Sequence, residues 1–589
     1  MNTRDSFFAP VQFDEPRGKP AAVLTRMVLS ILLLFFFIPS INLLALGEAD
    51  IPAGGSLFVI QDQTGGGIEI LKGLPVELYQ RIPPYYLISA PAASRSTIKE
   101  KGFKLFEIDG AESGESLFIL TRSSGMQLGS PPEAGEVLFQ GENWFLVRAQ
   151  QHTTALFGRE GFGFTHIPLH PLPIEISKKS DVLIPGRTSL SAEAGFKAAR
   201  SDSTIQSYLQ RLEDFQTRYS YTDSVVAAAE WIHDKFIEYG FTDVAYDSFW
   251  FDGTWQRNVV ATKAGTVKPD RIIIIGGHYD SVTYDWPECD PMTWAPGVDD
   301  NGSGTVLTMD MARILAGEES DKTLRFILFA AEEQGLYGSY HYAEYAYNSG
   351  MDLELMINMD MVGNLDDTYL DVDIDTDNQS MSYAELMAQV ALDSTDLIPY
   401  IGSSGYGSDH YPFMQYGFNH VYAQEGDFSP HWHLCSDTMG NIDVPYLVQA
   451  ENMILPTIII VANSKAVEVE VTCELSSVPQ GGNLPFTGSV ENLTNNTETV
   501  RVTLWVEGPG GNEFPYLGPF TITLQGGQVL TRYPSLAVPS NAPLGEYIVS
   551  LEAESLNGEL IDRDSFSVTV VGSDNEGVVD RSEFIIEGW

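Results

Sequence analysis

The stretch Arg271-Ile-Ile-Ile-Ile-Gly-Gly-His-Tyr-Asp-Ser281 decides the fold of this chain. Four consecutive isoleucines lack the alternation of apolar and polar residues that a half-exposed strand shows. They are typical of a strand buried on both faces of a sheet, and we expect this strand at Arg271–Gly276. Both faces of such a sheet must be covered, so this stretch predicts an α/β domain with helices on two sides.

Expected helices and strands alternate outward from this strand. Apolar residues at helical spacing and short apolar runs are the two signals. They predict helices at 204–217, 223–239, 303–316, 336–348 and 444–463, and strands at 258–262, 323–330 and 353–359. This alternation predicts a three-layer α/β/α domain with a mostly parallel central sheet over residues 201–465.

The flanking segments have a different pattern. Residues 50–175 contain short apolar runs separated by Gly, Pro and Ser, which predicts a β-rich N-terminal domain, followed by a linker at 176–200. Residues 466–573 contain runs of alternating polarity that predict a β-sandwich domain. Residues 574–589 form an acidic tail.

Residues 1–49 contain an apolar run at 27–46 that follows Arg17, Lys19 and Arg26. A transmembrane helix needs about 20 apolar residues, so this run is long enough to be a membrane anchor. The small residues that follow it also suit cleavage of a signal peptide, and the two interpretations stay open. In both, the positive flank predicts that the rest of the chain is extracytoplasmic, whether secreted, periplasmic or anchored at the cell surface.

The charge balance excludes some partners. The chain has 33 basic and 80 acidic residues, a net charge of -47. This charge repels nucleic acid and anionic membrane surfaces, so membrane contact is expected only through the N-terminal anchor. The three cysteines, Cys289, Cys435 and Cys473, are too few for a disulfide framework or a cysteine zinc site. One pair could form a disulfide, and the spacing does not decide which.

The isoleucine strand leads directly into His278 and Asp280. Imidazole is a common metal ligand, and Asp280 can accept the second ring N–H and so fix the tautomer. Open α/β sheets bind ligands at the carboxyl ends of their strands. This motif therefore predicts a metal ligand with a supporting carboxylate at that edge.

Two further motifs place adjacent carboxylates in loops. Gly297-Val-Asp-Asp-Asn-Gly-Ser-Gly304 precedes a helix, and Phe329-Ala-Ala-Glu-Glu-Gln-Gly335 follows a strand. Neighbouring carboxylates repel one another unless a cation neutralises one of them. In the second pair, Glu332 and Glu333, one side chain can bind a metal while the other acts as a general base towards water.

The last two motifs complete a set of metal-binding side chains. Asn358-Met-Asp360-Met ends an apolar strand, where a buried acid needs a cation or hydrogen-bond donors. His431-Trp-His-Leu-Cys-Ser-Asp-Thr438 lies in a polar loop before the last helix. Two imidazoles and three carboxylates suit zinc, with manganese or cobalt as alternatives. One carboxylate shared by two ions about 3.5–4 Å apart would make a two-metal hydrolase.

These motifs, in this order, resemble the M28 family of zinc aminopeptidases, which contains bacterial leucyl aminopeptidase. The resemblance covers roughly residues 200–465 and also includes Phe215–Ser220, Asn258–Thr262 and Ser408–Phe413. It implies the zinc-exopeptidase form of the α/β/α fold. It also implies that the substrates are the N-termini of peptides or proteins.

The resemblance implies two zinc ions held by five side chains. Asp299 is the expected shared carboxylate. The other expected ligands are Glu333 and His433 for one zinc, and His278 and Asp360 for the second.

The resemblance also assigns residues around the metals. Glu332 is the expected general base, while Asp280 and Asp300 support the ligands. The peptide bond between Asp299 and Asp300 is expected to be cis.

Two assignments depend on spacing within the family pattern. His433 is preferred over His431 because it lies four residues before Asp437, the spacing that the family uses. Tyr406 corresponds to the family's oxyanion-stabilising tyrosine. Its spacing to Ser408 is one residue shorter than in the bacterial leucyl enzyme, and the flanking cysteine pair of that enzyme is absent from this sequence.

The sequence thus predicts a zinc-dependent aminopeptidase. Relatives on the same fold are the alternatives: a glutaminyl-peptide cyclotransferase or an enzyme of carboxypeptidase type. A surface-binding protein without catalytic activity is a further alternative, which the complete ligand set disfavours.

Overall fold

The computed structural model describes residues 55–108, 116–121, 130–150, 153–160, 162–168, 171–174, 202–364, 369–403, 407–426, 428–494, 497–558, 560–572 and 586–587. The expected signal or anchor at 1–49 and the linker at 176–200 lie outside the described residues. So do Tyr406 and all of the acidic tail except residues 586–587.

The central element is an eight-stranded sheet in the order β15-β14-β16-β13-β11-β12-β10-β9. Its middle strands β16, β13, β11 and β12 pair in parallel, as do β14 and β15, whereas β10 pairs antiparallel with β9 and β12, and β14 pairs antiparallel with β16. The prediction of a mostly parallel sheet is therefore confirmed. The strands are β9 (Asp243–Phe251), β10 (Thr254–Lys263), β11 (Lys268–His278), β12 (Lys322–Phe329), β13 (Asp352–Met359), β14 (Asp371–Thr376), β15 (Ile398–Ser403) and β16 (His420–Glu425).

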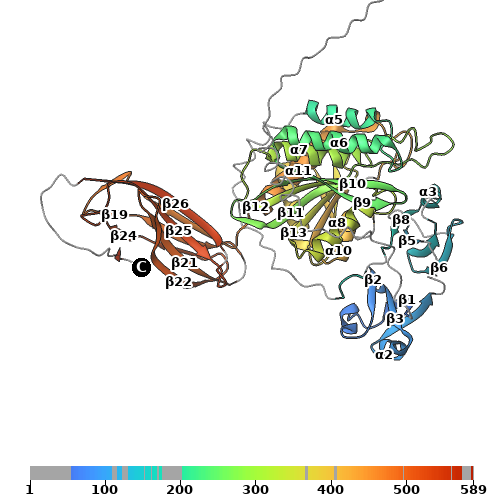
Figure 1. Ribbon diagram of the computed structural model, residues 1–589, viewed down its shortest axis with the longest axis horizontal. Helices are drawn as coiled ribbons and strands as arrows, with labels where there is room; N and C mark the ends of the chain where they lie inside the picture. Colours follow the sequence, from blue (N-terminus) through green and yellow to red (C-terminus); the bar gives the residue numbers. More distant parts are fainter. Residues whose placement is uncertain are drawn as a thin grey trace, which may run out of the picture. The chain divides into compact units, whose positions relative to one another are not determined.

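Helices cover both faces of this sheet, as predicted (Figure 1). On one face lie α5 (Asp202–Asp214), α6 (Asp223–Tyr239), α7 (Gly302–Leu315), α9 (Met381–Ser394) and α11 (Val444–Ala462). On the other face lie α8 (Tyr337–Asn348) and α10 (His410–Gln415).

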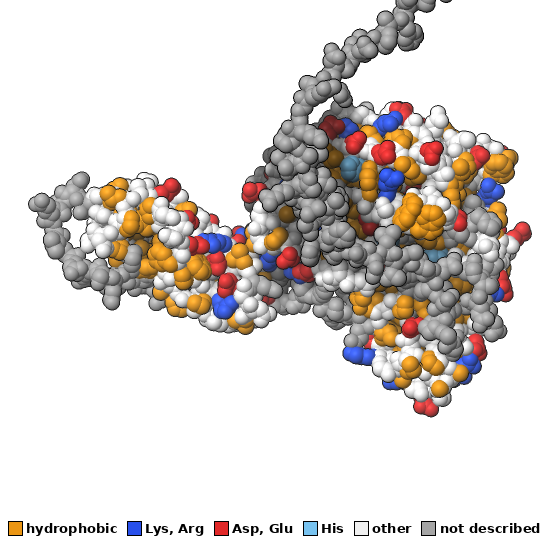
Figure 2. Space-filling view, in the orientation of Figure 1, with side chains coloured by type: hydrophobic (Ala, Val, Ile, Leu, Met, Phe, Trp, Pro, Cys, Tyr) orange, Lys and Arg blue, Asp and Glu red, His pale blue; other side chains and the backbone are white. Residues whose placement is uncertain are grey.

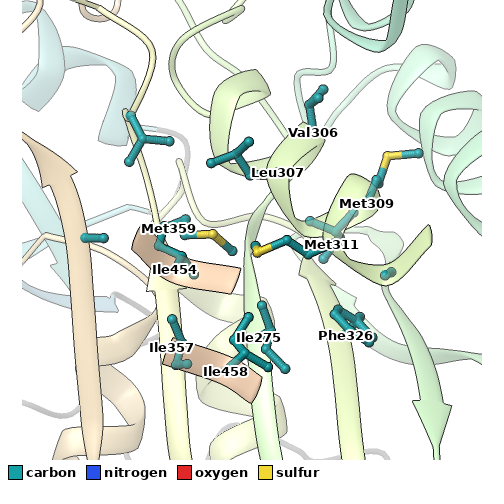
Figure 3. Packing of buried hydrophobic residues seen from close by; sticks show 14 of the residues in the cluster. Ile275, Val306, Leu307, Met309, Met311, Phe326, Ile357, Met359, Ile454 and Ile458 are labelled. Atoms are coloured by element: carbon teal, nitrogen blue, oxygen red, sulfur yellow. The ribbon is translucent and has the colours of Figure 1, made fainter. Parts of the chain in front are cut away.

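The isoleucines of β11 divide the interior into two cores. Ile273 and Ile275 belong to the apolar cluster under α7 and α11, whereas Ile272 and Ile274 belong to the cluster under α8 and α10. Successive side chains of a strand point to opposite faces, so an unbroken apolar run supplies both cores. Figure 3 shows the first core, in which Ile275 and Ile357 from the sheet face Met311 and Ile458 from the helices.

Helix α11 is the one described helix that is long and apolar enough to cross a membrane. Two thirds of its most apolar window is buried, 67%. Its buried residues, among them Ile454 and Ile458, belong to the cluster on the sheet. The apolar character of α11 is therefore that of a core helix.

The N-terminal segment contains two four-stranded sheets. One has the order β2-β3-β1-β4 and the second has the order β6-β7-β5-β8. Buried residues of the first sheet, including Phe58, Ile60 and Ile88, belong to the same cluster as Phe329 and Tyr340. The strands are β1 (Gly55–Asp62), β2 (Glu77–Ile82), β3 (Tyr85–Pro91), β4 (Phe103–Ile108), β5 (Ser116–Thr121), β6 (Glu136–Gln140), β7 (Trp144–Ala149) and β8 (Gly163–His166).

The C-terminal segment is all β in its described residues. A five-stranded sheet and two three-stranded sheets enclose one apolar cluster. The long strands are β17 (Val467–Thr472), β21 (Glu498–Glu507), β22 (Glu513–Leu524), β25 (Gly545–Glu554) and β26 (Leu560–Val571). Within the expected tail, β27 (Ile586–Glu587) pairs antiparallel with β24 (Ser535–Ala537).

Acidic side chains are spread over the visible face rather than gathered in one patch (Figure 2). This distribution fits a hydrated acidic surface, in which counterions screen the repulsion between neighbouring carboxylates.

Candidate metal centre

The candidate residues meet at one edge of the central sheet. His278 is the last residue of β11, Glu332 and Glu333 follow β12, and Asp360 follows β13. Because β11, β12 and β13 are parallel neighbours, their carboxyl ends lie together. The three strand ends therefore bring together side chains from motifs that are 82 residues apart in the chain, from 278 to 360.

The carboxylate of Asp300 lies between two imidazoles. Its Oδ1 is 3.3 Å from His278 Nε2, and its Oδ2 is 3.1 Å from His433 Nε2. Asp360 Oδ1 is 3.4 Å from the same nitrogen of His278, and Glu333 Oε2 is 2.9 Å from that of His433. The cluster thus has two halves, each with an imidazole and a carboxylate of its own, that share Asp300.

Asp300 takes the place that the sequence assigned to Asp299, so the expectation of a shared Asp299 carboxylate is corrected. The side chain of Asp299 turns away from the imidazoles, and its Oδ1 accepts a hydrogen bond of 3.0 Å from the backbone N–H of Gly363. The backbone of this loop directs the second carboxylate of the pair, rather than the first, towards the imidazoles. The cis peptide bond is likewise one residue later than expected, between Asp300 and Asn301.

Asn301 and Asp437 hold the backbone around Asp300. The Asn301 side chain caps α7 by accepting a hydrogen bond from Gly304 N. The two carboxylate oxygens of Asp437 accept hydrogen bonds from the backbone N–H groups of Asp299, at 2.8 Å, and Asp300, at 3.0 Å. Asp437 comes from the same loop as His433, so this loop both supplies an imidazole and orients the shared carboxylate.

Asp280 is also a supporting residue, but in a different way than expected. The ring Nδ1 of His278 is 3.1 Å from the backbone carbonyl oxygen of Asp280, closer than the 3.6 Å to its carboxylate. The carboxylate instead accepts the backbone N–H groups of Glu332, at 3.1 Å, and Glu333, at 3.2 Å. Asp280 thereby orients one imidazole with its main chain and the glutamate pair with its side chain.

Burial and mutual repulsion shift the pKa values of the carboxyl groups. Burial, and then the charge of Asp300, raise the pKa of Glu333 to about 7. Burial also raises the pKa of Glu332 well above its usual range, with further repulsion from Glu333 and Asp360. Burial alone would raise the pKa of Asp300 too, but hydrogen bonds from His278 and His433 lower it below the usual range.

Both imidazoles have raised pKa values. Burial lowers the pKa of His433, but Glu333 and Asp300 outweigh it and raise that pKa to about 10. Burial is likewise outweighed at His278, where Glu332 and Asp360 raise the pKa well above its usual value. So many buried acidic groups around two imidazoles make a site that favours positive charge.

The free atoms of the cluster fit a divalent cation. His278 Nε2, Glu333 Oε1 and Asp360 Oδ1 are buried and have no hydrogen-bond partner of good geometry among the described residues. Ligand atoms of His278, Glu332 and Asp360 lie within 4.8 Å of one another, as do those of His278, Asp300 and Glu333. A mixed set of nitrogen and carboxylate oxygen donors suits first-row divalent metals.

The two histidines of the last motif have different surroundings. His433 faces Glu333 and Asp300, and the indole of Trp432 stacks on its ring at 3.9 Å. His431 instead lies outside the cluster, with its Nδ1 2.8 Å from Ser436 Oγ. The structure therefore places His433 in the cluster, in agreement with the choice made by spacing.

Two features of the site are not evident from sequence reasoning. Arg218 is fully buried and donates to the carbonyl oxygens of Tyr279 at 2.7 Å, Pro296 at 2.6 Å and Gly297 at 2.7 Å. Arg218 lies within the Phe215–Ser220 motif, so the sequence points to this residue. No sequence pattern identifies the carbonyl groups that it binds. A disulfide also joins Cys289 to Cys435 across 146 residues.

Comparison with known proteins shows similarity to a family of peptidases. Residues 258–458 match the family model described as Peptidase family M28. The chain is 30% identical over 211 residues to "Aminopeptidase YwaD" of Bacillus subtilis, an alignment that covers 35% of this chain and 44% of that protein. It is 36% identical over 187 residues to a "Probable zinc metalloprotease" of Pyrenophora tritici-repentis, covering 28% of this chain and 42% of that protein.

The chain thus spans less than half the length of these two relatives. Among solved structures, the LapA aminopeptidase of Legionella pneumophila is similar, with 20% identity, a TM-score of 0.47, and coverage of 59% of this chain and 98% of that one. The matched segment contains the whole cluster, from His278 to His433. The candidate metal centre therefore lies within a segment that is similar to Peptidase family M28.

Proposed function

We propose that this protein is a zinc-dependent aminopeptidase that removes N-terminal residues from peptides, with two zinc ions per chain. The observation that carries the proposal is the position of Asp300, whose two oxygens face one imidazole each. A carboxylate shared between two such half-sites is the arrangement that a two-metal hydrolase needs.

The two halves of the cluster define the proposed metal positions. His278, Asp360 and Asp300 would hold one zinc, and His433, Glu333 and Asp300 would hold the second. The name of the fungal relative, a probable zinc metalloprotease, supports zinc over other divalent metals. When bound, zinc would supply Lewis acidity and lower the pKa of a bound water towards about 7.

Glu332 is the proposed general base. It lies beside the cluster, with its Oε2 3.7 Å from His278 Nε2, and its side chain is more exposed, at 11%, than that of Glu333, at 3%. A carboxylate with a raised pKa accepts a proton from water more readily and can return it to the leaving amine. Asp280 holds the backbone of Glu332 and so keeps this side chain at the cluster.

The acidic surroundings support a substrate with a free amino group. Six carboxylate side chains gather at the site, and the chain has a net charge of -47, so a cationic peptide N-terminus is attracted. The six carboxylates are Asp280, Asp300, Glu332, Glu333, Asp360 and Asp437.

We also propose an extracytoplasmic location, which the apolar run at 27–46 and its basic flank support.

A panel of aminoacyl-anilides tests the proposal. We expect release of the free aniline and the amino acid, loss of activity with a chelator, and recovery when zinc is added back. The N-acetylated form of the best substrate is the matched control, and an aminopeptidase should not cleave it. Conversion of an N-terminal glutamine to pyroglutamate on the intact peptide, with release of ammonia, would indicate a cyclotransferase instead. Cleavage of the acetylated substrate would contradict an aminopeptidase.

A further inference from the structure

His433 is held differently from the rest of the cluster. His278, Glu333 and Asp360 end or follow strands of the central sheet, and Asp300 precedes α7. His433 instead lies in the segment 428–438, which contains neither a helix nor a strand. Its backbone has φ of 55°, in the left-handed region that residues other than glycine rarely adopt. The orientation of this imidazole therefore depends on contacts outside regular secondary structure.

Besides the stacking of Trp432 and the bonds of Asp437 to the Asp300 loop, contacts to this segment come from the loop at 283–295. The carbonyl oxygen of His433 accepts hydrogen bonds from Tyr284 N, at 2.9 Å, and Thr283 Oγ1, at 3.2 Å. Two residues further along, Cys435 forms the disulfide with Cys289. The indole N–H of Trp294 donates to the carbonyl oxygen of Cys435 at 3.1 Å.

The loop at 283–295 is itself tied to the body of the domain. Ala295 N donates to the carbonyl oxygen of Gln216 at 2.9 Å, and Thr217 forms an isolated β-bridge with Ala295. Thr217 Oγ1 also donates to the carbonyl oxygen of Pro291 at 2.7 Å. The disulfide therefore connects the His433 segment covalently to a loop whose C-terminal end is bonded to Gln216 and Thr217.

We infer that the Cys289–Cys435 disulfide positions His433, and that it selectively supports the metal position formed by His433 and Glu333. This inference rests on the proposed function. Without the disulfide, the His433 segment keeps its hydrogen bonds to Thr283 and Tyr284 but loses its covalent restraint. The position formed by His278 and Asp360 lies on the ends of β11 and β13 and does not depend on that restraint.

Zinc titration of the full chain after both cysteines are replaced by serine tests this inference. The double variant Cys289→Ser/Cys435→Ser is used because a single remaining thiol beside the cluster would be a new metal ligand. Calorimetry and metal analysis should find two zinc sites in the wild type. In the double variant, one site should be weakened about 10–100-fold, as when a supporting residue of a metal ligand is lost. The second site should be unchanged.

Two further variants identify the site that is affected. Cys473→Ser, which removes the free cysteine of the C-terminal segment, should bind zinc like the wild type. In a His433→Ala background, loss of the disulfide should cause no additional weakening. If the double variant does not fold, the folded wild type is reduced with a phosphine, which is oxidised to its oxide with water while the cystine accepts two electrons and becomes two thiols. Both thiols are then capped by addition to a maleimide before the zinc titration, so that neither can bind zinc.

The outcomes separate this inference from the proposed function. A wild type with two zinc sites and a variant in which both sites are unchanged, or weakened equally, overturns the positioning role alone. A wild type that binds no zinc contradicts the proposed function and this inference together. Selective loss of one site, abolished in the His433→Ala background, supports the inference.

Discussion

At the scale of single residues, Glu332 and Glu333 are neighbours with different surroundings. Glu333 contacts His433 directly, whereas Glu332 is more exposed and stands beside His278. Under the proposed function, Glu332 would move a proton and Glu333 would hold a metal. The two should therefore respond differently to substitution.

Replacing Glu332 with Gln should leave zinc content unchanged and lower kcat by about 10²–10⁴-fold, because the amide cannot accept the proton of water. Metal analysis and anilide hydrolysis measure the two effects. Glu385→Gln, on the exposed surface of α9, is the control and should match the wild type in both. An unchanged kcat in Glu332→Gln would show that another group is the base.

Arg218 is a buried cation whose partners are backbone carbonyl oxygens rather than carboxylates. Its replacement by Met leaves the carbonyl groups of Tyr279, Pro296 and Gly297 without a donor, so we expect a loss of about 3–5 kcal/mol in the free energy of unfolding. Urea unfolding measures this loss. Arg211→Met is the control, because Arg211 is exposed and lies over the ring of Phe215, and should cost less than about 1 kcal/mol.

The sequence pattern around Asp299 and Asp300 predicts part of the site geometry but not all of it. The family resemblance predicts that one carboxylate of the pair lies between two imidazoles, and the structure places Asp300 there. The pattern contains no information about which member of the pair faces them, because that depends on how the loop approaches α7. Asp437 helps to set this orientation, because its carboxylate accepts the backbone N–H groups of both Asp299 and Asp300. It comes from a loop more than a hundred residues further along the chain.

At the scale of elements, the start of α7 is packed against the end of β13 with no space for a side chain. A Cβ added at Gly304 would lie 2.3 Å from the carbonyl oxygen of Met359, the residue before Asp360. Helix propensity alone would make Gly304→Ala stabilising by about 1 kcal/mol. We expect the opposite sign, a loss of about 1–3 kcal/mol, because the backbone of β13 must move.

Gly317 is the matched control for this prediction. It follows α7 at the exposed end, and a Cβ there would meet nothing within 4 Å. Thermal unfolding of Gly304→Ala and Gly317→Ala should show a lower Tm only for the first. Zinc affinity should also fall in Gly304→Ala, since the added methyl separates Asp300 from Asp360. Equal Tm values would mean that the two elements are less tightly packed than the distances indicate.

An imidazole–carboxylate pair links α8 to the edge strand β9. His341 Nε2 is 3.1 Å from Asp247 Oδ1. Burial lowers the pKa of His341, but the hydrogen bond and charge of Asp247 outweigh it, so the pKa is raised in the folded state. A raised pKa means that the stabilisation is complete below the unfolded-state pKa of about 6.5 and is lost as the pH rises through the folded-state pKa.

His341→Gln should therefore destabilise the protein more at about pH 5.5 than at about pH 9. The expected difference is below about 1 kcal/mol, because the pair is partly exposed. Chemical unfolding at both pH values measures it. In an Asp247→Asn background the pH dependence of the His341→Gln effect should vanish, and its persistence there would assign the effect to another group.

The element scale is also where sequence reasoning succeeds best. The expected helix at 223–239 is α6 with the same bounds, and the strand at 353–359 is β13 with one residue added at its start. Long periodic segments carry their own signal. The antiparallel edge strand β9 was not predicted, because an exposed edge strand mixes polar and apolar residues, as the half-buried Asp243–Phe251 does.

At the scale of the whole molecule, the dominant property is a net charge of -47. Repulsion among like charges destabilises a compact state, and added salt screens it. Raising NaCl from about 0.01 M to about 0.3 M shortens the screening length several-fold from about 30 Å, so Tm should rise. Scanning calorimetry measures the shift, and KCl at equal ionic strength should give the same one. A constant Tm would show that the charges are already far enough apart.

The whole-molecule arrangement is what the sequence predicts least. Composition and patterning indicate β-rich segments on both sides of the α/β domain. They do not indicate that Phe58 and Ile60 share an apolar cluster with Phe329 and Tyr340, or that Cys289 pairs with Cys435. Contacts between distant segments depend on complementary surfaces, which no local pattern records.

The double burial of β11 has a consequence for how this chain can change over evolutionary time. Ile273 and Ile275 pack against one set of neighbours, and Ile272 and Ile274 pack against another. A mutation at any of the four must be tolerated by the helices on its own side, while the strand as a whole must keep His278 at its end. Among relatives, accepted replacements at 273 and 275 should coincide with changes in α7 or α11. Replacements at 272 and 274 should instead coincide with changes in α8 or α10. The residues on the two faces of this strand should therefore vary independently of each other.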